Sequence, residues 1–140
     1  MKQLLLICLL LMLFRVLMAP EAPRLLIERA ERLDPYKRIV TAIGWVESRH
    51  DTLAYNAFEE ATGYFQIRPM RLRDYNRQSG DSLKMKDMFN YPLAVKVFMF
   101  YARQIGWRSP ERIAREWNGG SNGMKYRQTL KYWQLVKKVL

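Results

Sequence analysis

Cysteine and histidine are almost absent from this 140-residue chain, which has one of each, Cys8 and His50. A single cysteine excludes an internal disulfide and any metal site that is built from several thiolates. A single histidine likewise argues against a histidine-rich metal site. The sequence also contains no internal repeat and no low-complexity tract, which excludes repeat architectures and low-complexity linkers.

Acidic residues are scarce as well, with 13 Asp and Glu against 24 Lys and Arg, which gives a net charge of +11. Such a charge favours a polyanionic partner, which can be nucleic acid, anionic lipid or the acidic polymers of a bacterial wall. No zinc-finger, helix-turn-helix or RNA-binding signature is present, so we expect no nucleic-acid partner. Hydrophobic residues make up 49% of the chain, enough for one domain with a genuine core.

The N-terminus carries an apolar run, from Leu4 to Phe14, that is shorter than the ~20 residues needed to span a bilayer. It is typical of the hydrophobic region of a secretion signal. The candidate cleavage residues Ala19 and Ala22 each precede a proline, and Arg15 interrupts the run, so an uncleaved membrane anchor is the alternative. We expect export to the periplasm or cell envelope, with a signal peptide or N-terminal anchor over 1–19, a linker over 20–23 and the domain over 24–140.

Beyond the linker, apolar residues recur at helical spacing and strand signals are scarce, which predicts a mainly α fold. Prolines and glycines mark several helix boundaries. Residues 48–62 lack a clear period and are expected to form a loop with a short hairpin. The expected helices cover 24–33, 35–47, 69–78, 90–105, 110–118 and 129–140.

The first segment with chemical potential places Glu47 at the end of an apolar helix. A carboxyl group held against Ile43 and Val46 would lose the water around its charged form, which raises its pKa. A glutamate that is protonated near neutral pH can donate a proton to the leaving oxygen of a glycosidic bond. The competing interpretation is a solvated glutamate paired with Arg49.

Two further segments are rich in glycine, amide and aromatic residues. In 63–69, Gly63 permits close backbone approach, the Gln66 amide can bind sugar hydroxyls, and aromatic residues offer faces for sugar rings. An ordinary turn entering a helix is the alternative. The third segment, 117–123, is a glycine-rich turn that lacks the features of a phosphate-binding loop, since no Lys-Ser/Thr pair follows it and no strand precedes it.

In this order the three segments resemble the catalytic domain of the soluble lytic transglycosylases and their goose-type lysozyme relatives. Glu47-Ser48 matches the family's Glu-Ser pair, and 63–69 matches its Gly-x-x-Gln-Ile-x-Pro motif. Residues 117–120 resemble its Tyr-Asn-Gly turn, and Tyr132 with Val136 resembles its closing helix. The resemblance covers roughly 38–139.

This resemblance implies a lysozyme-like helical domain whose substrate cleft holds peptidoglycan glycan strands. The implied activity is that of a lytic transglycosylase, which cleaves the MurNAc-GlcNAc β-1,4 bond with a single catalytic glutamate and leaves a 1,6-anhydroMurNAc end. Glu47 would be the acid and base, without metal or cofactor. The substrate-binding set implied by the resemblance is Ser48, Asn56, Tyr64, Gln66, Trp117, Asn118 and Tyr132.

The chain departs from the family pattern in three ways. One extra residue separates Glu47 from Gln66. Trp117 stands where the family has a tyrosine that orients the glutamate, so that hydrogen bond must be absent or come from elsewhere, with Tyr132 as the candidate donor. Glu59-Glu60 adds negative charge near the expected cleft.

These departures keep two alternatives open. A hydrolytic muramidase with an inverting mechanism needs a second carboxylate about 6.5–9.5 Å from the acid to activate water, and Asp51, Glu59 and Glu60 are its candidates. A non-catalytic peptidoglycan-binding or assembly protein would result if Glu47 were misplaced. The basic residues from Lys125 to Lys138 are either a solvated helix face or a surface that attracts anionic wall or membrane.

Overall fold

The computed structural model describes residues 34–140, so the expected signal or anchor, the linker and the helix over 24–33 lie outside it. The described part is mainly helical, as predicted, with one two-stranded hairpin and two short 3₁₀ helices. Its elements are α3 (Lys37–Ser48), β1 (Tyr55–Asn56), β2 (Ala61–Thr62), α4 (Pro69–Ser79), η1 (Met85–Phe89), α5 (Tyr91–Ile105), α6 (Pro110–Gly119), η2 (Gly123–Lys125) and α7 (Arg127–Lys137).

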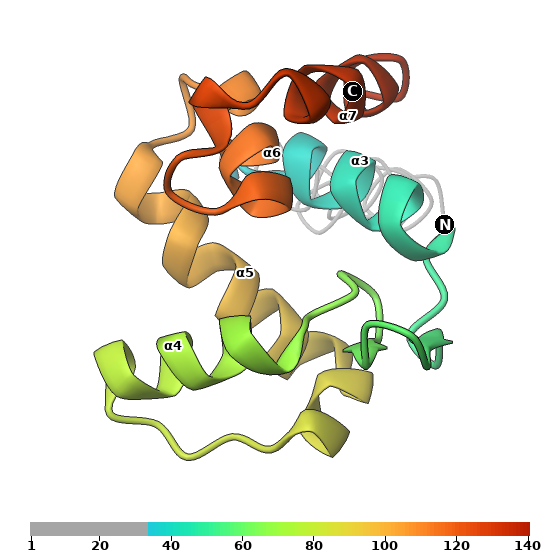
Figure 1. The fold of residues 1–140 in the computed structure, drawn as a ribbon, viewed down its shortest axis with the longest axis vertical. Coiled ribbons are helices and arrows are strands. Elements are labelled where there is room, and N and C mark those ends of the chain that lie inside the picture. The colour runs from blue at the N-terminus through green and yellow to red at the C-terminus, as the bar shows by residue number, and fades with distance from the viewer. Residues whose placement is uncertain (1–33) are drawn as a thin grey trace, which may run out of the picture. The chain divides into compact units, whose positions relative to one another are not determined.

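Helices α3, α6 and α7 pack against one another, and α5 connects them to the rest of the unit (Figure 1). Helix α5 contacts η1, α4 and α6. The hairpin lies beside η1. No helix within 34–140 has the length and apolar character that a membrane span requires.

Proline and glycine set the ends of two central helices, as the sequence predicts. Pro69 occupies the first turn of α4, and Gly80 ends that helix in a left-handed conformation with φ 77°. Asn90 caps α5 by accepting a hydrogen bond from the Leu93 backbone N–H, and Gly106, with φ 90°, follows its last residue. These two helices therefore follow local signals.

Elsewhere the boundaries differ from the prediction. We expected Asp34-Pro35 to start a helix, but α3 begins at Lys37 with Tyr36 as the residue before it. Helix α7 begins at Arg127, two residues earlier than the apolar pattern indicates. Neither 3₁₀ helix is evident from the sequence, because runs of five and three residues are too short to show a period.

The hairpin forms within the segment that was predicted to be a loop with a short hairpin. Tyr55 pairs with Thr62 and Asn56 with Ala61 in antiparallel register. The carbonyl of Ala54 accepts a 2.8 Å hydrogen bond from Gly63, which adopts φ 74°. A side chain at Gly63 would collide with the Met88 carbonyl, at 2.0 Å from an added Cβ, so glycine is required there.

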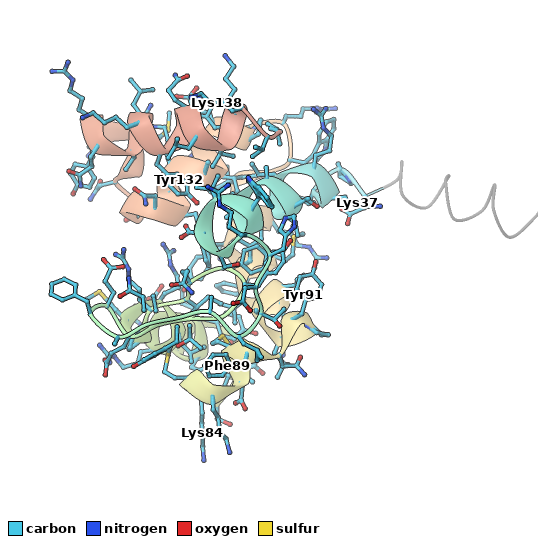
Figure 2. All side chains as sticks on the ribbon, turned by 90° about the vertical axis from the view of Figure 1, so that its right-hand side faces the viewer. Lys37, Lys84, Phe89, Tyr91, Tyr132 and Lys138 are labelled. Carbon is cyan, nitrogen blue, oxygen red and sulfur yellow. The ribbon has the colours of Figure 1, made fainter. Side chains whose placement is uncertain are left out.

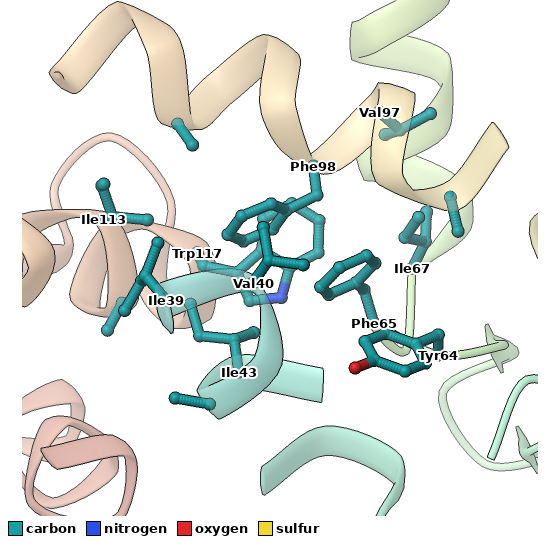
Figure 3. Packing of buried hydrophobic residues seen from close by; sticks show 14 of the residues in the cluster. Ile39, Val40, Ile43, Tyr64, Phe65, Ile67, Val97, Phe98, Ile113 and Trp117 are labelled. Atoms are coloured by element: carbon teal, nitrogen blue, oxygen red, sulfur yellow. The ribbon is translucent and has the colours of Figure 1, made fainter. Parts of the chain in front are cut away.

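Aromatic residues form the centre of the core, between α3, α5 and α6 (Figure 3). The rings of Phe65 and Phe98 stack at 4.6 Å, and the Trp117 indole meets Phe98 edge-on at 5.0 Å. Ile43 of α3 is fully buried. The packed core therefore fixes the end of α3, the loop before α4 and the end of α6 relative to one another.

Candidate active site

Glu47 lies in the last turn of α3, which reaches the surface where its apolar face ends. Residues 39, 40, 42 and 43 of this helix are buried, whereas Glu47 is half-buried. The helix stops because Arg49 and His50 take left-handed conformations, with φ values of 57° and 68°. The Arg49 guanidinium lies 4.8 Å above the Trp45 ring, and no ion pair joins it to Glu47 in the described part of the chain.

Burial raises the pKa of Glu47 from 4.5 to about 7, and the carboxylate of Glu59 contributes in the same direction. Hydrogen bonds from Tyr132 and Trp117 and the charge of Arg68 act in the opposite sense but are outweighed by burial. Near neutral pH the carboxyl is therefore about half protonated, which lets one group act as acid and as base.

Tyr132 of α7 is the hydrogen-bond partner of this carboxyl. Its hydroxyl donates to Glu47 Oε1 at 2.7 Å, and the residue is 9% exposed. Burial and the neighbouring Glu47 raise the pKa of the Tyr132 phenol far above its usual value, so the phenol keeps its proton and remains a donor. The structure thus contains the hydrogen bond for which Tyr132 was the candidate, from a different helix than the one that carries Trp117.

A cleft of about 1310 Å³ opens beside Glu47. Pockets that bind drug-sized molecules have volumes of about 300–1,000 Å³. This cleft is larger, so an extended ligand fits it better than a small molecule. The cleft is lined by residues of the hairpin, α4, α5 and α6. Five of the eight predicted site residues line it, namely Glu47, Asn56, Gln66, Trp117 and Asn118.

The other three predicted residues, Ser48, Tyr64 and Tyr132, are not among the cleft-lining residues. The Ser48 hydroxyl donates to the backbone carbonyls of Tyr64, at 2.9 Å, and Gly44, at 3.2 Å. The Tyr64 ring is buried and stacks on His50 at 5.3 Å. Ser48 and Tyr64 therefore join the end of α3 to the loop before α4. In the structure they hold in place the turn of α3 that carries Glu47.

Two of the cleft residues use part of their amide groups to shape the backbone. Gln66 adopts φ 47° and donates from Nε2 to the carbonyls of Gly63, at 3.0 Å, and Ala54, at 3.3 Å. Asn56 accepts hydrogen bonds from Phe58 and Glu59 backbone N–H groups, at 3.0 and 3.4 Å. The Asn56 NH₂ group remains available to a ligand.

Arg71, which is not among the residues predicted from the sequence, links α4 to the end of α6. Its guanidinium donates to the Trp117 carbonyl at 2.7 Å and to the Glu116 carbonyl at 3.2 Å. The same group lies 4.7 Å above the Tyr101 ring and 4.8 Å from the Trp117 ring. A planar guanidinium can make both kinds of contact at once. No sequence signal separates Arg71 from the exposed arginines of the same helix.

Among the three candidate second carboxylates, the structure places only Glu59 on the cleft. Glu59 forms a 2.8 Å ion pair with Arg68. Asp51 accepts a hydrogen bond from the Leu53 backbone N–H instead, and Glu60 is exposed away from the cleft lining. Two further acids, Asp74 and Glu116, line the cleft, and arginines pair with both. No three His, Cys, Asp or Glu side chains within 34–140 group as metal ligands.

Comparison with known proteins gives one significant similarity. The chain is 34% identical over 82 residues to an invertebrate-type lysozyme from Ruditapes philippinarum. The match covers 55% of this chain and 59% of that protein. No protein-family model matches the chain, and no solved structure matches it significantly. Together with the helical fold, the similarity suggests a lysozyme-like protein, and it does not single out the lytic transglycosylases among such proteins.

Proposed function

We propose that this protein is a peptidoglycan-cleaving enzyme of the lysozyme-like type and that it acts as a lytic transglycosylase. The observation that carries the proposal is the Glu47 carboxyl, whose pKa of about 7 and position on a long cleft suit proton transfer to a glycosidic oxygen. The similarity to a lysozyme supports peptidoglycan as the substrate. We expect the protein to act in the cell envelope after export.

In the proposed reaction, the neutral Glu47 carboxyl donates its proton to the oxygen that bridges MurNAc and GlcNAc. The C1–O bond of MurNAc then breaks, and GlcNAc leaves with its new hydroxyl. The Glu47 carboxylate next removes the proton from the C6 hydroxyl of the same MurNAc while that oxygen bonds to C1. The products carry a 1,6-anhydro end, Glu47 regains its proton, and no water is consumed.

Tyr132 assists both halves of this cycle. Its hydroxyl holds Oε1 in place and stabilises the carboxylate that forms after the first proton transfer. The Trp117 hydrogen bond acts on the same carboxyl in the same sense. These donors keep the pKa from rising further, so that the carboxylate stays accessible as a base near neutral pH.

The charge of the cleft suits an acidic glycan strand. Arginines at 68, 71, 73, 77 and 112 line it, against four acids, one of which is the partly protonated Glu47. Muramic acid and its peptide substituents carry carboxylates. A net positive cleft would attract such a strand and speed its association.

A hydrolytic muramidase is the second candidate, and Glu59 is the observation that favours it. Glu59 lines the same cleft and interacts electrostatically with Glu47, as its effect on the Glu47 pKa shows. A carboxylate placed across the scissile bond could activate water. Its ion pair with Arg68, at 2.8 Å, holds the side chain at this place on the cleft.

Digestion of purified wall sacculi, followed by mass spectrometry, tests the proposal. Wild-type protein should release 1,6-anhydro-muropeptides, Glu47→Gln should release none, and Glu59→Gln should still release them. Reducing ends that depend on Glu59 would support the hydrolase. If the wild type binds sacculi without releasing fragments, the protein is a non-catalytic binder and both enzymatic proposals are wrong.

A further inference from the structure

The outer face of α7 is basic and carries no acid. The sequence contains no Asp or Glu after Glu116, whereas five cations follow it. The inner face of α7 packs into the core through residues 129, 132, 133 and 136. The helical period therefore turns the cations within α7 outward. All five cations, at positions 125, 127, 131, 137 and 138, are exposed.

These cations are unpaired in the part of the chain that the structure describes. The ion pairs within 34–140 involve cations of α4, α5, α6 and the segment before α4, and none of those five. Lys138 lies on the outer side of α7, at the opposite end of the view from Lys84 (Figure 2). The positive charge of this face is therefore not neutralised by acids of its own unit.

Exposed apolar side chains stand among the cations. Leu130 is 41% exposed, Leu135 52% and Val139 44%. A hydrated sugar polymer offers these side chains little to bury against, whereas the interface of a lipid bilayer does. Cations that surround exposed leucines are typical of surfaces that bind bilayers containing anionic lipid.

We propose that the α7 face, defined as Lys125, Arg127, Leu130, Lys131, Leu135, Lys137, Lys138 and Val139, docks on an anionic lipid bilayer. Of the residues of α7, only Gln128 lines the cleft. A bilayer on the α7 face would therefore leave the cleft open to a glycan strand. The inference is independent of the chemistry at Glu47 and holds whether or not the protein cleaves peptidoglycan.

A dye on α7 tests this surface in the full-length chain. Cys8 is the only thiol, so Leu135→Cys in a Cys8→Ser background takes an environment-sensitive dye at one position. The dye reports on α7 alone, so binding of vesicles by the apolar residues 4–14 does not mimic the signal. We expect its emission to shift to the blue with phosphatidylglycerol vesicles but not with phosphatidylcholine vesicles, and raised salt to reverse the shift.

Charge reversals supply the matched comparison. Each cation near an anionic bilayer contributes about 5-fold to binding. The double substitution Lys131→Glu with Lys138→Glu should therefore weaken the affinity for vesicles, measured as the lipid concentration at the half-maximal dye shift, at least about 20-fold. The control is the double substitution Lys84→Glu with Lys86→Glu, which changes the net charge equally on exposed residues of another region. It should change the affinity for vesicles less than about 3-fold. Equal weakening by both pairs would overturn the proposal. So would a dye that responds to sacculi but not to anionic vesicles.

Discussion

The hydroxyl of Tyr132 donates a 2.7 Å hydrogen bond to Oε1 of Glu47, which lies 85 positions earlier in the chain. This contact joins the last helix of the fold to the end of α3, and it acts on a carboxyl whose pKa burial has raised to about 7. Burial raises the pKa of Glu47 and the Tyr132 hydrogen bond lowers it, and the effect of burial is the larger. Their balance puts the carboxyl near half protonation at neutral pH.

Removing the Tyr132 hydroxyl should shift the midpoint of the pH–activity profile to higher pH. Tyr132→Phe removes a hydrogen bond that lowers the pKa of Glu47, so that pKa rises and the carboxylate forms less readily. A hydrogen bond to a charged group contributes about 1.5–3 kcal/mol, so the rate near neutral pH should fall about 10- to 100-fold. Rates of sacculus digestion across a pH series check this.

Tyr55→Phe is the control for that series, because Tyr55 is exposed on the hairpin and lies outside the cleft lining. It should reproduce the wild-type profile. A Tyr132→Phe profile with an unchanged midpoint would mean that the phenol does not act on Glu47.

The ionisation of Glu47 should also be visible in stability. Its folded-state pKa lies above its unfolded value of 4.5, so the folded protein binds more protons between pH 4.5 and about 7. Glu47 is thus best tolerated at low pH, and its destabilising effect develops between pH 4.5 and about 7 and is complete above that. Glu47→Gln should gain about 2–3 kcal/mol of unfolding free energy relative to wild type between pH 4 and pH 8.

Urea unfolding of both proteins at a series of pH values checks this expectation. The difference between the two curves is the measured quantity, because other titrating groups contribute equally to both. Parallel curves from pH 4 to pH 8 would show that folding leaves the pKa of Glu47 unchanged.

Arg71→Lys should destabilise the fold although it keeps the charge. A lysine ammonium cannot contact both the Tyr101 and Trp117 rings and donate to the Trp117 carbonyl at the same time, as the planar guanidinium does. We expect the free energy of unfolding to fall by about 1–3 kcal/mol. Activity should fall with it, since Trp117 and Asn118 line the cleft.

Arg73→Lys is the matched control for unfolding, because Arg73 is an exposed arginine of the same helix with no such contacts. Its free energy of unfolding should change by less than about 0.5 kcal/mol. Equal unfolding curves for Arg71→Lys and Arg73→Lys would rule out the stacked guanidinium as a link between α4 and α6.

Gly44→Ala should disturb the packing of Tyr64 against the last turns of α3, which carry Glu47. An added Cβ would lie 1.8 Å from Cε1 of Tyr64, so the ring must move. Overpacking of this kind costs about 1–3 kcal/mol. Combining Gly44→Ala with Tyr64→Ala should recover part of that loss, which a double-mutant cycle of unfolding free energies measures. Strictly additive effects would contradict the contact.

Local signals were enough for much of the fold. Pro69 and Gly80 bound α4, and Asn90 and Gly106 bound α5, because each residue acts on the backbone beside it. The position of Glu47 at the end of an apolar helix follows from period and length in the same way. The start of α3 was predicted wrongly because Asp34-Pro35 offers a start signal that the helix does not use.

The remaining features depend on contacts between distant segments. Arg71 differs from Arg73 only in what α5 and α6 bring to it, which no local pattern records. Ser48 and Tyr64 were expected at the substrate, and the fold turns them instead toward the backbone that carries Glu47. Their part in substrate binding remains a prediction. The resemblance names residues that the structure places on or beside the cleft at Glu47, but only the packing separates those that line the cleft from those that do not.

Direct titration of Glu47 is the most direct test of the central claim. In protein labelled with ¹³C at the glutamate carboxyl carbons, the Glu47 signal is the one that disappears in Glu47→Gln. We expect its chemical shift to titrate with a midpoint of about 7. A midpoint near 4.5, the ordinary value, would contradict the account, because Glu47 would then hold no proton to donate at neutral pH.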